Sequence, residues 1–229
     1  MTSSNQSMDE ALDADRRLAL SYVALPIRRR LETLWRLDAA MGAVIAGGRE
    51  PLISRIKLAW WRDALELLDT AAPPAEPLLQ ALAADVLPFG VTGAELAVME
   101  EGWTRLTEPD ALGPEDLATY AAARGGVLFA LSGRLLGGGF EAGVKAAGEG
   151  LALADLARHS AEASDAAVAL RAASEKLARV TGRWPTKLRP LGMLAALAAR
   201  DVANGAEWFE PHGAPPRMWR MLGHRLTGR

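Results

Sequence analysis

The feature that most constrains the fold of this chain is its supply of helix-forming residues, which runs almost unbroken from end to end. Alanine and leucine provide most of the apolar content and β-branched residues are few, so helix is favoured over strand throughout. Proline and glycine divide the sequence into segments, because proline suits the first turn of a helix and glycine its end. No segment is convincing as a strand, and no internal repeat is evident. The sequence therefore predicts an all-α protein.

The predicted helices begin at prolines or capping residues and end at glycines or further prolines. Their approximate bounds are 9–24, 26–45, 51–69, 77–86, 92–106, 114–136, 140–162, 164–180, 185–204 and 216–226. The proline-rich stretch 71–77 is a linker, Thr92 and Glu95 form a capping box, and Ser164 is a candidate helix cap. We expect residues 1–8 to be disordered and residues 9–229 to form a single domain.

Composition excludes several classes of site. The chain of 229 residues has no cysteine, so disulfides, thiolate metal sites and a cysteine nucleophile are excluded. Its three histidines are far apart in sequence, which argues against a histidine zinc site. A formal net charge of −2 gives no reason to expect a nucleic-acid partner. No apolar run is long enough to span a bilayer, and the N-terminus lacks the apolar core of a signal peptide, so we expect a cytoplasmic protein.

The segment from Arg49 to Glu66 contains two adjacent tryptophans in a predicted helix. Two apolar rows follow from helical spacing: Ile53, Ile56, Trp60, Ala64 and Leu67 in one, and Leu58, Trp61, Leu65 and Leu68 in the other. A helix that is apolar over so wide an arc is expected to be central, with neighbours on several sides or a cavity against it. The alternative is that both indoles simply fill a core. As the structural alternative to binding a ligand, Arg55 and Arg62 can pair with Glu66 or Asp69, and Arg62 and Glu66 have the i,i+4 spacing that suits such a pair.

The same segment, with its Arg-Glu-Pro-Leu and Trp-Trp-Arg-Asp-Ala-Leu runs, resembles the squalene/phytoene synthase family. Further similarities occur in the order expected for that family, at 25–31, 34–41, 116–126, 148–158 and 215–220. The resemblance is nearest to a branch that includes mitochondrial complex I assembly factors and their bacterial relatives. It implies an isoprenoid-synthase-like helical bundle around a central cavity. Small residues at 118–134 and 142–157 would allow two of its helices to approach closely.

Active members of this family join two prenyl diphosphates, and two clusters of aspartates hold the Mg²⁺ ions that the reaction needs. This chain departs from that pattern at both clusters. No acidic residue lies between Ala39 and Gly48, and the flanking Asp38 and Glu50 are too far apart to replace the first cluster. In the region that resembles the second acidic motif, Asp155 and Arg158 match the family pattern, but His159 and Ala163 occupy positions where acidic residues are expected. We therefore predict no standard synthase activity, no metal ligand and no cofactor, and the sequence does not identify a catalytic residue.

Six residues remain as candidates for binding a ligand in the cavity that the resemblance implies: Arg30, Trp61, Arg62, Tyr120, Asp155 and Arg158. Each has a purely structural alternative. Arg30 belongs to a run of three arginines that would suit a solvated face, and Tyr120 would suit a core with its hydroxyl satisfied. Asp155 and Arg158 would suit an ion pair on an exposed stripe, and His159 a surface or cap position.

Three functions stay open on the sequence. The first is a squalene/phytoene synthase-like protein without synthase activity that binds an isoprenoid or another lipid, or acts as an assembly or interaction factor. The second is an active prenyl transferase that uses Mg²⁺ with displaced acidic residues, which would need Asp38, Glu50 and Asp155 to converge. The third is a structural interaction protein whose interior is filled by its own side chains. The basic and apolar segment 215–226 suits a peripheral contact with an anionic membrane, or the last helix of the bundle with its arginines in water.

Overall fold

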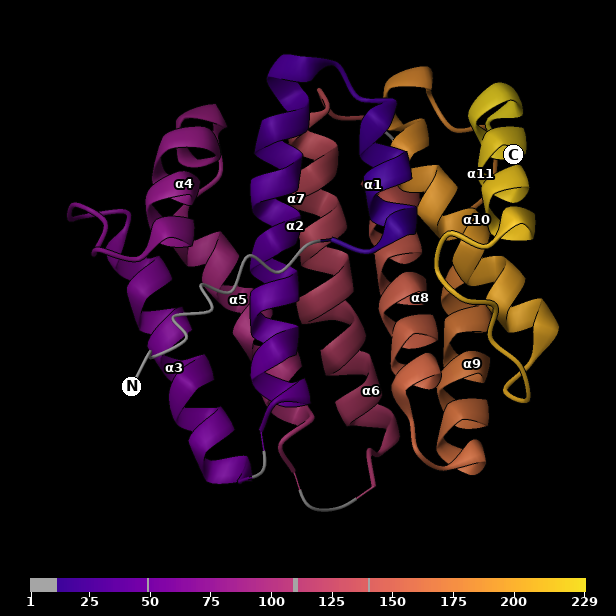
Figure 1. Ribbon diagram of the computed structural model, residues 1–229, viewed down its shortest axis with the longest axis horizontal. Coiled ribbons are helices and arrows are strands. Elements are labelled where there is room, and N and C mark those ends of the chain that lie inside the picture. Colours follow the sequence, from indigo (N-terminus) through magenta and orange to yellow (C-terminus); the bar gives the residue numbers. More distant parts are fainter. Residues whose placement is uncertain (1–11, 49, 109–110, 140) are drawn as a thin grey trace, which may run out of the picture.

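A computed structural model of the protein describes residues 12–48, 50–108, 111–139 and 141–229. The described residues form helices and connecting loops without a strand, which confirms the all-α prediction (Figure 1). The α-helices are α1 (Ala14–Ser21), α2 (Leu25–Ala46), α3 (Pro51–Leu67), α4 (Pro77–Asp85), α5 (Gly93–Arg105), α6 (Pro114–Tyr120), α7 (Val127–Leu135), α8 (Glu141–His159), α9 (Ala163–Leu177), α10 (Arg189–Asn204) and α11 (Pro215–Thr227). A π-helical segment, η2 (Ala121–Gly126), joins α6 to α7, and short 3₁₀ turns lie at Leu87–Phe89 (η1) and Thr186–Leu188 (η3). The predicted disorder of residues 1–8 concerns positions outside the described residues.

Most predicted helix bounds agree with the structure to within a few residues, because proline, glycine and capping signals act locally. The capping box at Thr92 and Glu95 is confirmed, and the predicted linker before Pro77 is a loop between α3 and α4. The predicted helix at 114–136 is helical without a break over 114–135, with π geometry at 121–126. One prediction was wrong: α9 begins after Glu162 rather than at a Ser164 cap. Among the residues described, none of the helices has the length and apolar content that crossing a bilayer requires.

The helices stand side by side across the molecule, with α3 and α4 at one edge and α11 at the other (Figure 1). Helix α3 packs on α5, α8 packs on α9, α10 and η2, and α11 packs on α10. Helix α2 lies between the two edges and is joined to α7 by a buried hydrogen bond, in which Trp35 Nε1 donates to Ser132 Oγ over 3.0 Å. The elements that form the candidate site therefore come from the middle of the molecule.

Helix α3 is not the central helix that its two apolar rows predicted. The row containing Trp61 is buried, with that side chain 7% exposed. In the other row only Ala64 is buried, and Trp60 is 48% exposed. Neighbouring helices cover one side of α3, so the other row keeps its contact with solvent. Five exposed apolar side chains on this helix, here named the α3 stripe, are Leu52, Ile53, Ile56, Trp60 and Leu67. The wide apolar arc thus reflects an exposed surface as well as a core.

Helix α8 and the π-helical segment cross in very close contact. A Cβ atom added at Gly125 would lie 2.1 Å from the carbonyl oxygen of Gly148, and one added at Gly148 would lie 2.1 Å from that of Gly125. On the other side, a Cβ at Gly102 of α5 would lie 2.8 Å from the backbone nitrogen of Arg124. The small residues predicted to permit close helix packing do so here. As a result, the backbone around Arg124 is enclosed by two other helices.

Candidate functional site

The centre of the molecule contains a buried arginine. Arg124 lies in η2 and is only 5% exposed. Its Nε donates to Asp38 Oδ1 over 2.9 Å and its Nη2 to Asp38 Oδ2 over 3.2 Å, an arrangement that engages both oxygens of that carboxylate. Nη2 also lies 2.7 Å from Asp155 Oδ2, and Nη1 donates to the hydroxyl of Tyr120. One guanidinium thus joins carboxylates from α2 and α8.

The π-helical backbone positions this arginine. At its end the N–H of Val127 donates to the carbonyl of Ala122, five residues earlier rather than the four of an α-helix. Such segments contain one more residue than the surrounding α-helix and occur often at functional sites. The sequence contains one signal for this residue: Arg124 is the only charged residue between Asp116 and Arg134. A single charge in a long run of small and apolar residues has to be either exposed or paired, and here it is paired.

A second cation supports the same carboxylate. Arg16 of α1 donates from Nη2 to Asp38 Oδ2 over 2.7 Å, so Asp38 faces two guanidinium groups. Burial alone would raise the pKa of Asp38, but Arg124 and Arg16 outweigh burial and leave this pKa below its usual range. Asp155 behaves in the same way, because Arg124, His159 and Arg16 overcome the effect of burial and lower its pKa to about 2. Both carboxylates are therefore ionised at neutral pH.

Two aromatic side chains complete the surroundings of the guanidinium. Its carbon atom lies 4.0 Å from the ring centroid of Trp103 on α5, a cation–π contact. Trp103 and Tyr120 meet edge to face with ring centroids 6.1 Å apart. Burial raises the pKa of the Tyr120 hydroxyl above its ordinary value, so this group stays protonated and cannot serve as a base at neutral pH.

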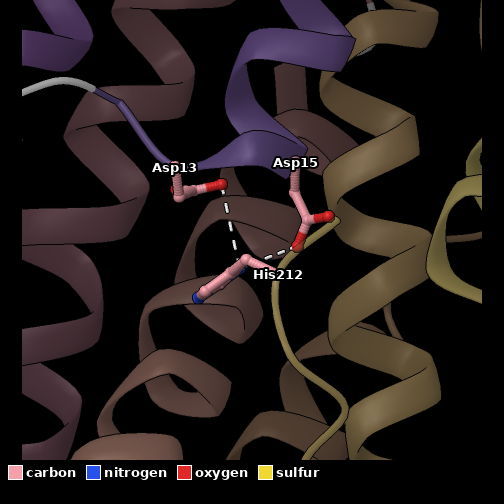
Figure 2. A group of neighbouring side chains, drawn as sticks. All are labelled: Asp13, Asp15 and His212. Atoms are coloured by element: carbon pink, nitrogen blue, oxygen red, sulfur yellow. Dashed lines mark hydrogen bonds and ion pairs between the residues drawn. The ribbon is translucent and has the colours of Figure 1, made fainter. Parts of the chain in front are cut away.

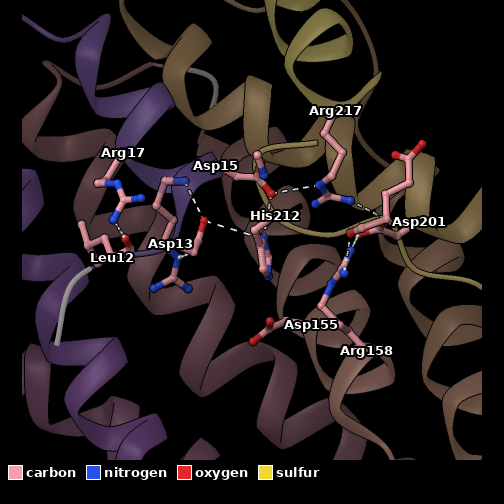
Figure 3. A network of polar contacts seen from close by, with 12 residues as sticks. Leu12, Asp13, Asp15, Arg17, Asp155, Arg158, Asp201, His212 and Arg217 are labelled. Atoms are coloured by element: carbon pink, nitrogen blue, oxygen red, sulfur yellow. Dashed lines mark hydrogen bonds and ion pairs between the residues drawn. The ribbon is translucent and has the colours of Figure 1, made fainter. Parts of the chain in front are cut away.

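A second polar network adjoins the first (Figure 3). The carboxylate of Asp15 in α1 lies 2.7 Å from His212 Nδ1 and accepts from Arg217 Nε over 2.9 Å and from the backbone N–H of Gly213 over 3.0 Å. Arg217 of α11 also donates from Nη1 to Asp201 Oδ1 of α10 over 2.6 Å, and Arg158 of α8 donates from Nη2 to Oδ2 of the same carboxylate over 2.9 Å. This network fastens α1 to α8, α10 and α11 and closes one side of the site.

Asp13, Asp15 and His212 come close enough to suggest a metal site, since one ligand atom from each lies within 4.8 Å of the others (Figure 2). Their bonding argues otherwise. Both oxygens of Asp15 already face hydrogen-bond donors, including the positively charged Arg217. Oδ1 of Asp13 accepts from the backbone N–H of Arg16 over 2.8 Å and thereby caps α1. These groups act as a clasp between the start of α1 and the loop before α11, and they do not suit a cation.

The Mg²⁺ ions of the family that the sequence resembles do not fit the Arg124 site either. Mg²⁺ requires several free oxygen ligands at about 2.1 Å in octahedral geometry. Both oxygens of Asp38 are engaged by guanidinium groups, and Asp155 is bound to Arg124. Two fixed positive charges occupy the space that faces these carboxylates. Glu50 lies just before α3 and is exposed, so it adds no ligand to the site.

A small cavity lies between the two networks. Its volume is about 50 Å³, and it is lined on its polar side by Asp38, Arg124, Asp155 and His212 and on its apolar side by Leu128, Phe129, Leu151 and Leu197. One water needs roughly 10–15 Å³ of such space, so the cavity suits a few waters. Pockets for drug-sized ligands measure roughly 300–1,000 Å³, so a prenyl chain exceeds this cavity. At this position, side chains of the described residues leave only this small space.

The structure does not bring the six predicted site residues together. Tyr120 and Asp155 contact Arg124, and Arg158 belongs to the adjoining network, where it also donates to the backbone carbonyl of Glu210. Arg30 stacks on Phe89, with its guanidinium carbon 3.2 Å from the ring centroid. Trp61 is buried on the inner side of α3, and Arg62 is largely exposed. Arg30, Trp61 and Arg62 are not among the described residues that line the cavity.

The ion pairs that the sequence offered as structural alternatives are replaced by others. Asp155 pairs with Arg124, and Arg158 pairs with Asp201, because side chains from other helices contact them. Arg62 pairs with its neighbour Asp63 rather than with Glu66, at 2.7 Å. Arg55 donates to Thr107 and Glu108 at the end of α5, not to a residue of its own helix. His159 is exposed, as the sequence predicted.

Comparison with protein-family models, with curated proteins and with solved structures finds no match. The interpretation of the site therefore rests on its own residues. The chemistry that these residues favour is charge neutralisation and helix fastening: carboxylates, guanidinium groups and a protonated phenol that satisfy one another.

Acid is expected to destabilise the protein between pH 3.8 and about 2. Burial would raise the pKa of Asp15, but His212, the backbone of Gly213 and Arg217 lower it to about 2, and Asp155 also titrates at about 2. Because these folded-state values lie below those of the unfolded chain, the stabilisation is complete above pH 3.8 and lost as pH falls through 2. Each group contributes about 2 kcal/mol. Urea midpoints measured across this window should fall steadily, and the Asp15→Asn variant should show a shallower fall. A midpoint that does not change across this window would contradict the assignment.

Proposed function

We propose that this chain is a single squalene/phytoene synthase-like domain that has no synthase activity and acts by binding a partner. The observation that carries the proposal is the position of Arg124 between Asp38 and Asp155. Those two carboxylates come from the two regions that resemble the acidic motifs of the family, and they converge on one centre, where Arg124 contacts both. A fixed guanidinium provides the charge compensation that bound Mg²⁺ provides in an active synthase.

Ionising a prenyl diphosphate requires a metal that neutralises the diphosphate as it leaves. Carboxylates already bound to two guanidinium groups have little capacity to hold such a metal, and withdrawing them would leave buried cations unpaired. The cavity of about 50 Å³ is also too small for the substrate chain. This size argues equally against the alternative of an isoprenoid bound in the interior.

Because the central cavity is too small for a prenyl ligand, the proposed function depends on the protein surface. The α3 stripe supports an interaction role, because its members are between 45% and 67% exposed and lie along one helix. Contiguous apolar surface of this kind commonly marks a contact with another protein or a membrane. We propose that the stripe contacts an apolar helix of a partner protein, since a helix presents apolar side chains at the same spacing.

Incubation with farnesyl or geranylgeranyl diphosphate and Mg²⁺ tests the loss of synthase activity. The expected result is no diphosphate release above the protein-free rate and no bound prenyl product in native mass spectrometry. The matched control is the Asp155→Asn variant, which removes one centre carboxylate. Release at an enzymatic rate by the native chain, abolished in this variant, would overturn the proposal in favour of a prenyl transferase with an unusual centre.

A further inference from the structure

Positive charge is concentrated in two stretches near the C-terminus. Residues 176–200 and 211–229 contain ten lysines and arginines and no aspartate or glutamate, although the whole chain has a net charge of −2. The structure brings parts of both stretches together at the end of α11. Arg183 donates to the carbonyl of Thr227 over 2.5 Å, and Arg189 to those of Arg225 and Leu226 over 2.9 and 3.1 Å. Arg183, Arg189, Arg220 and Arg229 are here named the basic end.

The basic end has a net positive charge that nearby residues do not cancel. In the part of the chain that the structure describes, no carboxylate lies within 4.0 Å of the charged nitrogens of its four arginines. Other basic side chains of the protein, such as Arg124 and Arg217, are fully paired. The protein thus pairs its interior cations with carboxylates. At the basic end, Arg183 and Arg189 contact backbone carbonyls, and Arg220 and Arg229 are exposed.

Helix α11 adds apolar side chains to this charged surface. Trp219 is 72% exposed and Leu226 is 76% exposed. They are seven residues apart, so they lie on the same side of the helix. The opposite side of α11, with Met221 and His224, is buried against the protein, and α11 packs on α10. The outward side of the helix is therefore apolar at two protruding positions and cationic at its margin.

A groove lies beside this helix. It has a volume of about 270 Å³, an apolar floor that includes Leu177, Val180 and Ala196, and two arginines, Arg220 and Arg229, in its lining. His224 also contributes to it, but burial and then Arg220 lower the pKa of this side chain to about 4, so it is neutral at neutral pH. The charge of the groove at neutral pH therefore comes from its arginines.

We propose that the outward side of α11 and the basic end form a docking surface for a lipid bilayer that contains anionic phospholipids. Trp219 and Leu226 would enter the interface, and Arg220 and Arg229 would contact lipid phosphates. Anionic lipids attract basic side chains near the membrane surface, and tryptophan favours the headgroup level. Charge complementarity would also suit a nucleic acid or an acidic protein. However, the exposed Leu226 cannot stack on a base and gains most from an apolar phase. The inference does not depend on the loss of synthase activity.

Flotation with lipid vesicles tests this surface. The native chain is expected to float with vesicles of phosphatidylcholine and phosphatidylglycerol and not with phosphatidylcholine alone, and to be released by high salt. The Trp219→Ser/Leu226→Ser variant should bind at least about tenfold more weakly, because it loses two buried apolar side chains. Each change of Arg220 or Arg229 to glutamine should weaken binding about fivefold.

The matched control is the Trp60→Ser/Leu52→Ser variant, which removes the same residue types from α3 at the opposite edge of the molecule (Figure 1). It should bind vesicles as the native chain does, and thermal melts should show that all variants are folded. The proposal fails if anionic vesicles do not bind, or if the α3 control weakens binding as much as the α11 variant. It also fails if double-stranded DNA or polyglutamate binds to the same arginines while vesicles do not. None of these outcomes depends on the diphosphate assay.

Discussion

Replacement of Arg124 by alanine is expected to lower the free energy of unfolding by about 3–5 kcal/mol. The change leaves Asp38 buried with only Arg16 as its partner and removes the strongest partner of Asp155. A buried charge without its counterion is among the most destabilising consequences of a single substitution. Chemical denaturation followed by circular dichroism gives the measurement.

The control for this experiment is Arg134→Ala. Arg134 also contacts a carboxylate through two nitrogens, that of Glu95, but its side chain is 46% exposed. Its loss should therefore cost less than about 1 kcal/mol. If the Arg124 variant does not fold, an Arg16→Met/Arg124→Met/Asp38→Asn/Asp155→Asn variant should recover most of the stability, because two positive and two negative charges are removed together. If the two alanine variants, at Arg124 and at Arg134, lose the same free energy of unfolding, the buried cluster does not depend on its central cation.

Replacement of Trp61 by alanine is expected to cost about 3–5 kcal/mol, because it leaves a large cavity behind α3. The same change at Trp60 should cost less than about 1 kcal/mol, since that ring is 48% exposed; it meets Trp61 edge to face at a centroid distance of 5.2 Å. The two variants have the same composition and differ by one position, so their urea midpoints can be compared directly. Similar losses at both positions would mean that α3 is enclosed on two sides, as its sequence pattern suggested.

Local signals explain why most helix bounds could be predicted. The Pro77 start and the Thr92–Glu95 capping box each depend on residues within a few positions of one another. Whether an apolar row of a helix is buried does not depend on such local signals. Ile56 and Leu58 have similar hydrophobicity and lie in the same helix, yet the first is 58% exposed and the second fully buried. Only the position of α3 at the edge of the molecule separates them, and no local pattern specifies that position.

The site illustrates the same limit. Tyr120 and Asp155 could be selected because they lie in segments with a recognisable pattern. The residue that joins them could not, since Arg124 and Asp38 are 86 residues apart and meet only through the packing of η2 against the other helices. Helix propensity does not specify the π-helical backbone either, because Gly125 and Gly126 weaken the helix locally without selecting a π turn over another irregularity. Predicting the ion pairs would have required the tertiary arrangement first.

The π-helical segment has a consequence for how this chain is aligned with other proteins. A segment with one residue more than a regular helix behaves as a single-residue insertion between α6 and α7. An alignment without a gap through residues 121–126 would match one of these helices correctly and shift the other by one position, which rotates every side chain by about 100°. Arg124 would then be aligned with residues whose side chains lie on a different side of the helix. A single gap, placed within Ala121–Gly126, keeps Tyr120 and Ser132 each in register with its structural counterpart.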